Sequence, residues 1–305
     1  MNVSEGAENV ENGLIKKATG GFYYVLSGSD TLECRARGVF RKRDETPLVG
    51  DRVTVQVLPD GKGYVQEILP RKNSFIRPPL ANLDQLVMVV SVAQPEPNLF
   101  VLDKLIAVAE HQDVDPVLVF TKTDLADAGP YRAIYEKAGF TTLETSALEH
   151  QGSGSVLKLL EGKISAFLGN SGAGKSSLLN DIFPQLGIET AEISQKLGRG
   201  RHTTRHVELF SVDGDGWVAD TPGFSSIDLE RVEVIRKEAL QYCFREFAPY
   251  ISKCRFTGCS HVSEKGCAVL DAVAAGEIPE SRHQSYKALY EEARQLKEWE
   301  LADRT

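Results

Sequence analysis

A glycine-rich segment near the middle of the chain has the spacing of a phosphate-binding loop. It follows the apolar run KISAFL and precedes the helix-forming stretch SLLNDIF, so a strand would lead into it and a helix would follow. Glycines let backbone amides approach phosphate oxygens, and the helix amino-terminus adds a favourable dipole. A chance glycine-rich turn is the alternative, and the flanking patterns argue against it. We expect nucleotide phosphates to contact Gly169, Asn170, Ser171, Gly172, Ala173, Gly174, Lys175, Ser176 and Ser177.

Charged and hydroxyl groups next to this loop could carry out phosphate chemistry. Lys175 should reach the β- and γ-phosphates, and Ser176 should ligate Mg²⁺. Downstream, the apolar run WVAD ends at Asp220, which would hold Mg²⁺ through water, and the amide of Gly223 would sense the γ-phosphate. The tetrapeptide DTPG alone would be an ordinary turn, but a phosphate loop upstream favours a switch element. Lys175 and Gly223 are therefore catalytic candidates.

Two short segments could select the base. Thr121, Lys122 and Asp124 lie in TKTD, which follows the apolar run PVLVF. The Asp124 carboxylate can accept hydrogen bonds from guanine N1 and N2, which adenine cannot offer, while the Lys122 stem covers the ring. Ser146 and Ala147, in TSA after FTTLE, resemble a weaker guanine-supporting motif, for which an ordinary loop is an equal alternative. The pattern predicts GTP rather than ATP, although Thr121 stands where GTPases commonly carry Asn.

A cluster of metal-binding residue types lies further along the chain. The pattern is Cys254-x4-Cys259-x-His261-x5-Cys267. Three thiolates and one imidazole suit tetrahedral Zn²⁺, and four protein ligands leave no open position, so one structural zinc ion per chain is expected. A chance group of reduced thiols is the alternative. Cys34 and Cys243 are isolated in the sequence, and we expect them to be buried core thiols.

Composition restricts the kinds of protein that could carry these residues. The 305 residues are 42% hydrophobic and 26% charged, and no apolar run approaches the length of about 20 residues that a membrane span needs. The start MNVSEGAENVENG lacks the basic and apolar regions of a secretory signal. The net charge of −8 leaves local basic patches for a nucleic-acid partner. We therefore expect a cytoplasmic protein without a membrane partner.

Hydrophobic patterns predict three domains that would position these residues. Short β-branched and aromatic runs over residues 14–69 indicate a small all-β barrel. From residue 84 to about 228, buried-strand runs alternate with helical periodicity, which is typical of a parallel α/β domain. The stretches RVEVIRKEALQYCFREF and SYKALYEEARQLKEWEL then have the pattern of amphipathic helices. The expected domains are 1–72, 73–228 and 229–305.

The order of the motifs is unusual. GTPases ordinarily carry the phosphate loop first and the guanine motifs last, but here TKTD and TSA precede GNSGAGKS, and DTPG comes after it. The central domain therefore resembles a circularly permuted P-loop GTPase. Such an arrangement places the switch regions next to the following domain, so that the nucleotide state could move that domain.

Together these features resemble one bacterial family. The combination of GNSGAGKS, GRHTTRH, DTPGF, TKTD and CRFTGCSHVSEKGC is similar to the GTPases of small-ribosomal-subunit biogenesis, the RsgA/YjeQ type. The resemblance covers nearly the whole chain. It implies a barrel of the oligonucleotide/oligosaccharide-binding (OB) type, a permuted GTPase domain and a mainly helical zinc-binding module. It also implies GTP hydrolysis stimulated by the small subunit during late maturation.

The segment GRGRHTTRH resembles the effector loop of that family. Thr204, in preference to Thr203, would then complete the Mg²⁺ shell in the GTP state. Because Phe224 rather than a glutamine follows DTPG, another group must position water, and His202 is our candidate. The alternatives are a solvated basic loop and a His202 that contacts RNA or packs.

Two basic segments could contact RNA. Beside Phe40 lie Arg35, Arg37, Arg41, Lys42 and Arg43, and beside the metal motif lie Lys253, Arg255 and Phe256. Basic groups next to an aromatic ring suit phosphate contact and base stacking, and a solvated charged loop is the alternative for the first group.

The leading hypothesis is an enzyme that converts GTP and water into GDP and phosphate. Its expected partners are GTP or GDP and the small ribosomal subunit with its rRNA, and a monomer is expected. Alternatives of a different class are a metal carrier and a nucleotide-gated RNA-binding module in which hydrolysis is incidental. A permuted GTPase acting on the large subunit is disfavoured by the barrel and the Cys/His module. Thr121 and Phe224 predict slow turnover without a partner.

Overall fold

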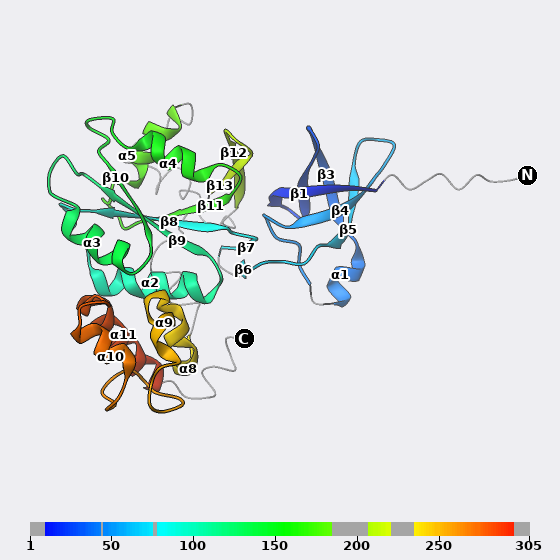
Figure 1. Ribbon diagram of the computed structural model, residues 1–305. Helices are drawn as coiled ribbons and strands as arrows, with labels where there is room; N and C mark the ends of the chain where they lie inside the picture. The colour runs from blue at the N-terminus through cyan, green and yellow to red at the C-terminus, as the bar shows by residue number, and fades with distance from the viewer. Residues whose placement is uncertain (1–9, 44, 76–77, 185–206, 221–234, 296–305) are drawn as a thin grey trace, which may run out of the picture. The chain divides into compact units, whose positions relative to one another are not determined.

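The computed structural model describes residues 10–43, 45–75, 78–184, 207–220 and 235–295 (Figure 1). In this structure the chain divides into two compact units. Unit 1 comprises residues 1–83, 161–166 and 198–222, and unit 2 comprises residues 84–160, 167–197 and 223–305. Across the described ranges, we find no helix with the length and apolar character that crossing a bilayer requires.

Unit 1 contains the predicted all-β barrel, which is drawn in blue in Figure 1. Its strands are β1 (Val10–Thr19), β2 (Phe22–Ser27), β3 (Asp30–Ala36), β4 (Arg52–Val57) and β5 (Gly63–Ile68). Neighbours pair in the order β1-β2-β3-β5-β4, all antiparallel except β3 with β5. Strand β4 also pairs with β1, which closes the barrel and confirms the expected fold.

Small and β-branched residues fill the barrel. Val25, Val53 and Val65 are fully buried, and Cys34 lies among them, so its expected place in the core is confirmed. Burial and the nearby Glu33 raise the pKa of Cys34 to about 11, which keeps the thiol protonated. A methyl group on Gly63 would come within 2.8 Å of the Cys34 sulfur, so a glycine is needed at this close approach.

Further strands complete unit 1. They are β6 (Ser74–Phe75), β7 (Leu80–Ala81), β12 (Glu208–Val212) and β13 (Gly216–Asp220), together with the first residues of β11 (Ile164–Leu168). Strand β13 is parallel to β11 and antiparallel to β12, and β12 pairs with β1 at Lys17 and Glu208. The buried Asp51 carboxylate accepts two hydrogen bonds from Arg71, at 2.7 and 2.8 Å, which ties the end of the barrel to the chain that leaves it.

Unit 2 begins with the predicted parallel α/β alternation. Its elements are β8 (Gln85–Ser91), α2 (Leu99–His111), β9 (Asp115–Thr121), α3 (Gly129–Lys137), β10 (Thr141–Thr145), α4 (Ser153–Leu160) and α5 (Lys175–Ile182). Strand β9 lies between β8 and β10 and is parallel to both. The apolar runs of β8 and β9 are buried along nearly their whole length, as expected for strands covered on both faces. Asn98 is the N-cap of α2, and its side chain accepts a hydrogen bond from the Val101 amide.

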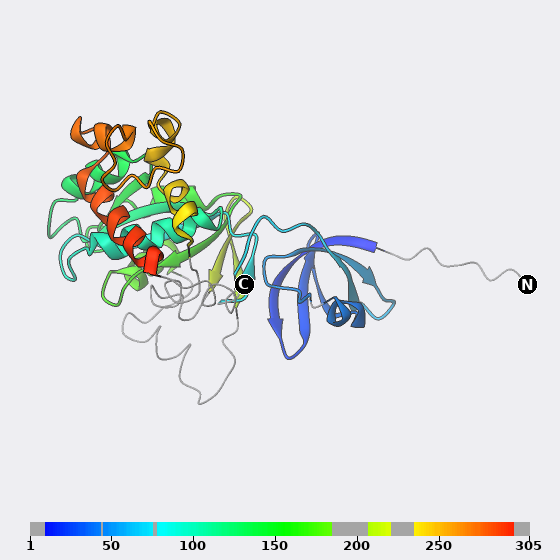
Figure 2. The same ribbon diagram turned by 90° about the horizontal axis from the view of Figure 1, so that it is seen from below.

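The last part of unit 2 is mainly helical. It comprises α8 (Lys237–Leu240), 3-10 turns at Gln241–Cys243 and Arg245–Phe247, α9 (Ala248–Ile251), α10 (Ala268–Ala274) and α11 (Glu280–Gln295). Figure 2 looks onto these helices, and α11 packs against α2. Cys243 is buried here, as expected.

One sequence-based expectation about these helices was wrong. The stretch RVEVIRKEALQYCFREF was expected to form one amphipathic helix, but its described part breaks at Phe244, where the backbone is extended (φ −118°, ψ 88°). The break lets Phe244 and Phe247 both pack on Tyr286, with ring centroids 5.2 and 4.9 Å away. Core packing therefore outweighs the helical periodicity of the segment.

Candidate functional site

The predicted phosphate loop connects β11 to α5 in unit 2. Gly172 and Gly174 have φ of 79° and 88°, and Gly174 is the N-cap residue immediately before α5. A methyl group on Gly169 would come within 3.0 Å of the Val89 carbonyl oxygen, so the loop lies directly against β8. Lys175, Ser176 and Ser177, which were predicted to bind phosphate and Mg²⁺, form the first turn of α5. The local geometry is that of a helix amino-terminus opened by a glycine turn, which suits an anion.

Thr121 connects the predicted base motif to this loop. It is the last residue of β9 and is buried, and its hydroxyl donates a hydrogen bond of 2.6 Å to the Ala173 carbonyl. The same hydroxyl lies 3.4 Å from the Val90 carbonyl. A methyl group on Gly174 would lie 3.3 Å from the Thr121 oxygen, so the side chain packs against the loop. Two segments far apart in the sequence thus share one rigid contact.

Asp124 and Ser146 meet across two loops. The Ser146 hydroxyl donates to Asp124 Oδ1 at 2.7 Å and accepts from the Glu149 amide at 3.2 Å. Ser146 is fully buried, and its backbone exchanges hydrogen bonds with Gln151. A carboxylate has acceptor positions on both oxygens, so Asp124 can still accept from two donors of a base. The serine fixes the orientation of that carboxylate.

A cavity of about 120 Å³ lies beside these groups. Its walls are Thr121, Lys122, Asp124, Thr145, Ala147, Leu148, Gly174, Ser177 and Leu178. The Lys122 ammonium group donates a hydrogen bond to the Gln94 carbonyl, which holds its stem in place. Leu148 is 78% exposed, so it offers an apolar surface at the cavity rim rather than a core contact. The structure therefore brings the predicted base residues and the carboxyl-terminal side of the phosphate loop together.

Other predicted site residues cannot be placed around this cavity. His202, Thr203, Thr204, Gly223 and Phe224 lie outside the described residues. Asp220 is the last residue of β13, and its side chain is not described. The roles assigned to these residues stay predictions.

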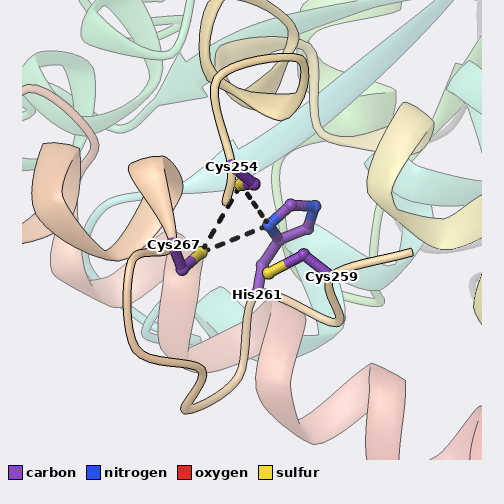
Figure 3. Close-up of side chains that lie close together, drawn as sticks. All are labelled: Cys254, Cys259, His261 and Cys267. Atoms are coloured by element: carbon purple, nitrogen blue, oxygen red, sulfur yellow. Dashed lines mark hydrogen bonds between the residues drawn. The ribbon is translucent and has the colours of Figure 1, made fainter. Parts of the chain in front are cut away.

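The four predicted metal ligands gather in the helical part of unit 2 (Figure 3). The ligand atoms of Cys254, Cys259, His261 and Cys267 all lie within 4.8 Å of one another. Cys254 Sγ lies 3.9 Å from Cys267 Sγ, and His261 Nδ1 lies 3.6 Å from the Cys254 sulfur and 3.3 Å from the Cys267 sulfur. A tetrahedral ion with metal–sulfur bonds of about 2.3 Å would place its sulfur ligands about 3.8 Å apart. The residues therefore fit a single four-coordinate metal ion.

A neighbouring side chain fixes which nitrogen of His261 can bind a metal. Gln241 Nε2 donates to the Glu238 carbonyl, which turns its Oε1 towards His261 Nε2 at 2.9 Å. Nε2 therefore carries the proton, and Nδ1, the atom that faces the sulfurs, is left as the ligand. Burial lowers the pKa of His261 and raises the pKa of Cys259 to about 12, so an added cation would have to stabilise the thiolate form.

The loop between the ligands is organised by Glu264. Its carboxylate accepts hydrogen bonds from the amides of Ser260, Val262 and Ser263, at 2.8, 3.1 and 3.1 Å, and from the Ser260 hydroxyl. Burial acts to raise the pKa of Glu264, but hydrogen bonds from Ser260 and Ser263 hold it at about 2. The ionised carboxylate thus fixes the backbone that carries Cys259 and His261.

The sequence can now be compared with known proteins. The family model described as RsgA GTPase matches residues 68–230, and the one described as RsgA N-terminal domain matches residues 12–65. The chain belongs to the RsgA GTPase family. GTP hydrolysis is thus the activity of its family. The circular permutation of the GTPase domain, which was predicted from the order of its motifs, is confirmed.

Relatives of this RsgA-family chain cover almost its full length. The Small ribosomal subunit biogenesis GTPase RsgA of Shouchella clausii is 46% identical over 280 residues, which span 90% of this chain and 94% of that one. The protein of the same name in Geobacillus kaustophilus is 44% identical over 291 residues, spanning 93% and 98%. YjeQ from Thermotoga maritima is 33% identical with a TM-score of 0.80 and covers 94% of this chain and 100% of its own. The circularly permuted GTPase YloQ is 37% identical with a TM-score of 0.80, covering 97% and 99%.

In the barrel of this family member, the structure changes the expected RNA-contact residues. Phe40 was expected to stack on a base, but it is only 3% exposed and lies in α1 (Gly38–Lys42). Another row of barrel residues combines aromatic rings with a guanidinium group. Phe22, Arg35 and Tyr64 are direct neighbours across β2, β3 and β5, and the Arg35 guanidinium lies 4.7 Å from the Phe22 ring centroid. Tyr64 is 40% exposed.

Sequence reasoning missed this row because its members come from three strands. Only the pairing register of the barrel brings them side by side, and their spacing along the chain gives no signal of that pairing. In the helical module, the expected aromatic and basic residues do meet. Arg255 lies 5.3 Å from the ring centroid of Phe256, which is 53% exposed.

Proposed function

We propose that this protein hydrolyses GTP to GDP and phosphate during late maturation of the small ribosomal subunit, in the cytoplasm, and that binding to the subunit stimulates it. The contact that best supports guanine binding is the one between Ser146 and Asp124, because it orients a carboxylate beside the cavity next to the phosphate loop. Membership of the RsgA family and the names of its relatives support the ribosomal role.

Within this proposal, the residues of the phosphate loop retain the roles inferred from sequence. Lys175 would neutralise the β- and γ-phosphates, and Ser176 would ligate Mg²⁺, with Asp220 and Thr204 as further ligands. His202 would position the attacking water, and the Gly223 amide would sense the γ-phosphate. The position of Lys175 and Ser176 in the first turn of α5 supports their part of this assignment.

We assign zinc to the Cys254, Cys259, His261 and Cys267 cluster. Three thiols and one imidazole at tetrahedral spacing are the ligands that Zn²⁺ prefers in structural sites. The bound ion would supply folding free energy to a loop-rich segment and would take no direct part in hydrolysis.

For the rRNA partner, we propose two surfaces. The first is the row of Phe22, Arg35 and Tyr64 on the barrel, and the second is Arg255 with Phe256 beside the metal cluster. An exposed ring next to a guanidinium can stack on a base while the charge contacts phosphate.

The test of the enzymatic role is GTP hydrolysis by the purified protein alone, with small subunits and with large subunits. ATP as substrate and the variant Lys175→Ala serve as controls. We expect slow turnover alone and strong stimulation by small subunits only, which ATP and the variant should lack. Equal GTP turnover in all three mixtures would contradict the proposal and leave a nucleotide-gated RNA-binding module as the better description.

The role of His202 needs a separate measurement. Substitution His202→Ala should lower subunit-stimulated turnover while leaving the dissociation constant for GDP unchanged, because a water-positioning group acts on the reaction step rather than on binding. Unchanged stimulated turnover would remove His202 from the catalytic assignment.

A further inference from the structure

The hydroxyl of Thr121 is committed to a hydrogen bond within the protein. It donates to the Ala173 carbonyl at 2.6 Å, and the Val90 carbonyl lies 3.4 Å away as a competing acceptor. A threonine hydroxyl carries one proton and can donate one hydrogen bond. Because Thr121 is 5% exposed and packs against Gly174, the protein holds this bond in the wall of the base cavity.

Guanine presents acceptors at N7 and O6 and donors at N1 and N2. An acceptor such as N7 needs a donor from the protein. The Asn that GTPases commonly carry at the position of Thr121 has two amide protons, so it can serve a loop carbonyl and N7 together. Threonine in the same place has none left after it has bonded to Ala173.

The other groups that line the described cavity are committed or suited to different atoms. The Thr145 hydroxyl faces the Phe120 carbonyl, and the Lys122 ammonium donates to the Gln94 carbonyl. Ser177 belongs to the first turn of α5, where we assign it to phosphate, and Leu148 contributes an exposed apolar side chain at the rim. Asp124 as a carboxylate can only accept.

We propose that this protein recognises guanine through N1 and N2 and that none of its described residues donates a hydrogen bond to N7, with Thr121 as the residue that determines this. The proposal rests on the guanine site of the proposed function and specifies how that site reads its ligand. The Thr121 hydroxyl proton is used in the hydrogen bond to Ala173, which links the base motif to the phosphate loop, and is not available to the base.

A nucleotide analogue isolates the atom concerned. In 7-deaza-GDP, carbon replaces N7 and the N1 and N2 donors are kept, whereas inosine diphosphate keeps N7 and lacks the N2 amino group. The full-length protein should bind 7-deaza-GDP within about twofold of GDP, and it should bind inosine diphosphate about tenfold more weakly. ADP should be weaker still, because it lacks both donors.

Two substitutions test the part played by Thr121. Thr121→Asn adds a second amide proton, so GDP should become preferred over 7-deaza-GDP by about fivefold. Thr121→Val keeps the shape and removes the hydroxyl, so both nucleotides should bind more weakly by the same factor and their ratio should stay near one. Calorimetric titration of each variant gives the dissociation constants, and circular dichroism checks that it is folded.

Two results would overturn the inference. A preference of the unmodified protein for GDP over 7-deaza-GDP of fivefold or more would show that N7 is read. Equal affinities of the Thr121→Asn variant for GDP and 7-deaza-GDP would show that Thr121 does not determine whether N7 accepts a hydrogen bond. Equal affinity for GDP and ADP is a different outcome, because it would contradict the guanine site itself.

Discussion

At the scale of single residues, the hydroxyl of Ser146 orients the Asp124 carboxylate, which we propose binds the base. Its hydroxyl is held between Asp124 Oδ1 and the Glu149 amide in a fully buried position. A carboxylate fixed before binding loses less freedom when the ligand arrives, which raises affinity. We therefore expect Ser146 to affect guanine binding through Asp124.

Substitution Ser146→Ala should weaken GDP binding by about tenfold, because Asp124 loses the donor that orients it. ADP does not use the carboxylate, so its affinity should change little. The matched control is Ser155→Ala, since Ser155 is an exposed serine in α4. Competition against a fluorescent guanine nucleotide measures both constants, and equal effects of the two substitutions would contradict the role of Ser146.

Gln241 carries a similar role at the metal cluster. Substitution Gln241→Ala should lower zinc affinity about tenfold to a hundredfold, because the proton of His261 Nε2 loses its acceptor. Gln241→Glu keeps an acceptor and should retain most of the affinity. Titration against a chromophoric chelator measures the constants, with the exposed Gln284→Ala as control. If Gln241→Ala bound zinc like the control, the orienting role would be wrong.

Residue types with a fixed chemistry were predictable from the sequence. The phosphate loop and the Cys/His cluster have characteristic spacings, and the structure brings the cluster together as predicted. The stacking role of Phe40 was wrong, and the row of Phe22, Arg35 and Tyr64 was not foreseen. Spacing along a chain reports local contacts, whereas contacts between strands depend on register, which the sequence does not state.

At the scale of elements, a buried ion cluster attaches α11 to α2. Arg282 is fully buried, and it donates to Asp103 of α2 and to Glu246, both at 2.7 Å. Its guanidinium lies 4.6 Å from the Phe244 ring centroid, and Tyr135 donates to Asp103 at 3.0 Å. Burial raises the pKa of Asp103, while Arg282 opposes this shift. The pairing fixes how α11 packs on the α/β part of unit 2.

Substitution Arg282→Met should cost about 3–5 kcal/mol of unfolding free energy, because it leaves two carboxylates buried without their partner. Arg294→Met is the control. It breaks an exposed pair with Glu291 and should cost far less than Arg282→Met, because solvent screens that pair. Urea denaturation measures both values, and similar losses for the two variants would show that the buried cluster contributes little.

Elements with strong periodicity were the easiest to predict. The buried strands β8 and β9 and the barrel strands β2, β4 and β5 agree with the runs that predicted them. The expected single helix through Phe244 was wrong, because hydrophobic periodicity does not show where a chain must turn to bury two rings. The cluster around Arg282 also escaped prediction, since its members come from distant segments.

At the scale of the whole molecule, the helical metal module and the α/β part share one core in unit 2. Ala107 of α2 belongs to the same buried cluster as Phe244, Val269 and Tyr286. A ligand that stabilises one part should therefore stabilise the other, because a shared core unfolds cooperatively. The domain boundary expected at residue 229 stays a prediction.

GDP should raise the midpoint temperature of the unfolding transition of unit 2. Removal of the metal should lower the midpoint of that same transition. GDP at a hundred times its dissociation constant adds about 2.7 kcal/mol to the stability of the part that binds it. Scanning calorimetry with and without a zinc chelator, each with and without GDP, measures the two effects. A chelator that left the GDP-sensitive transition unchanged would show that the metal module unfolds independently.

The hydrogen bond between Thr121 and Ala173 joins two segments that are synthesised at different times. The two residues are 52 positions apart, so at about 5–20 residues per second the loop carbonyl is made about 3–10 s after the threonine. Ser146 precedes Ala173 by 27 positions, so the segment with Asp124 and Ser146 is complete about 1–5 s before the loop carbonyl is made. In that interval the nascent chain has no phosphate loop, so nucleotide binding cannot stabilise the segment that we propose binds the base.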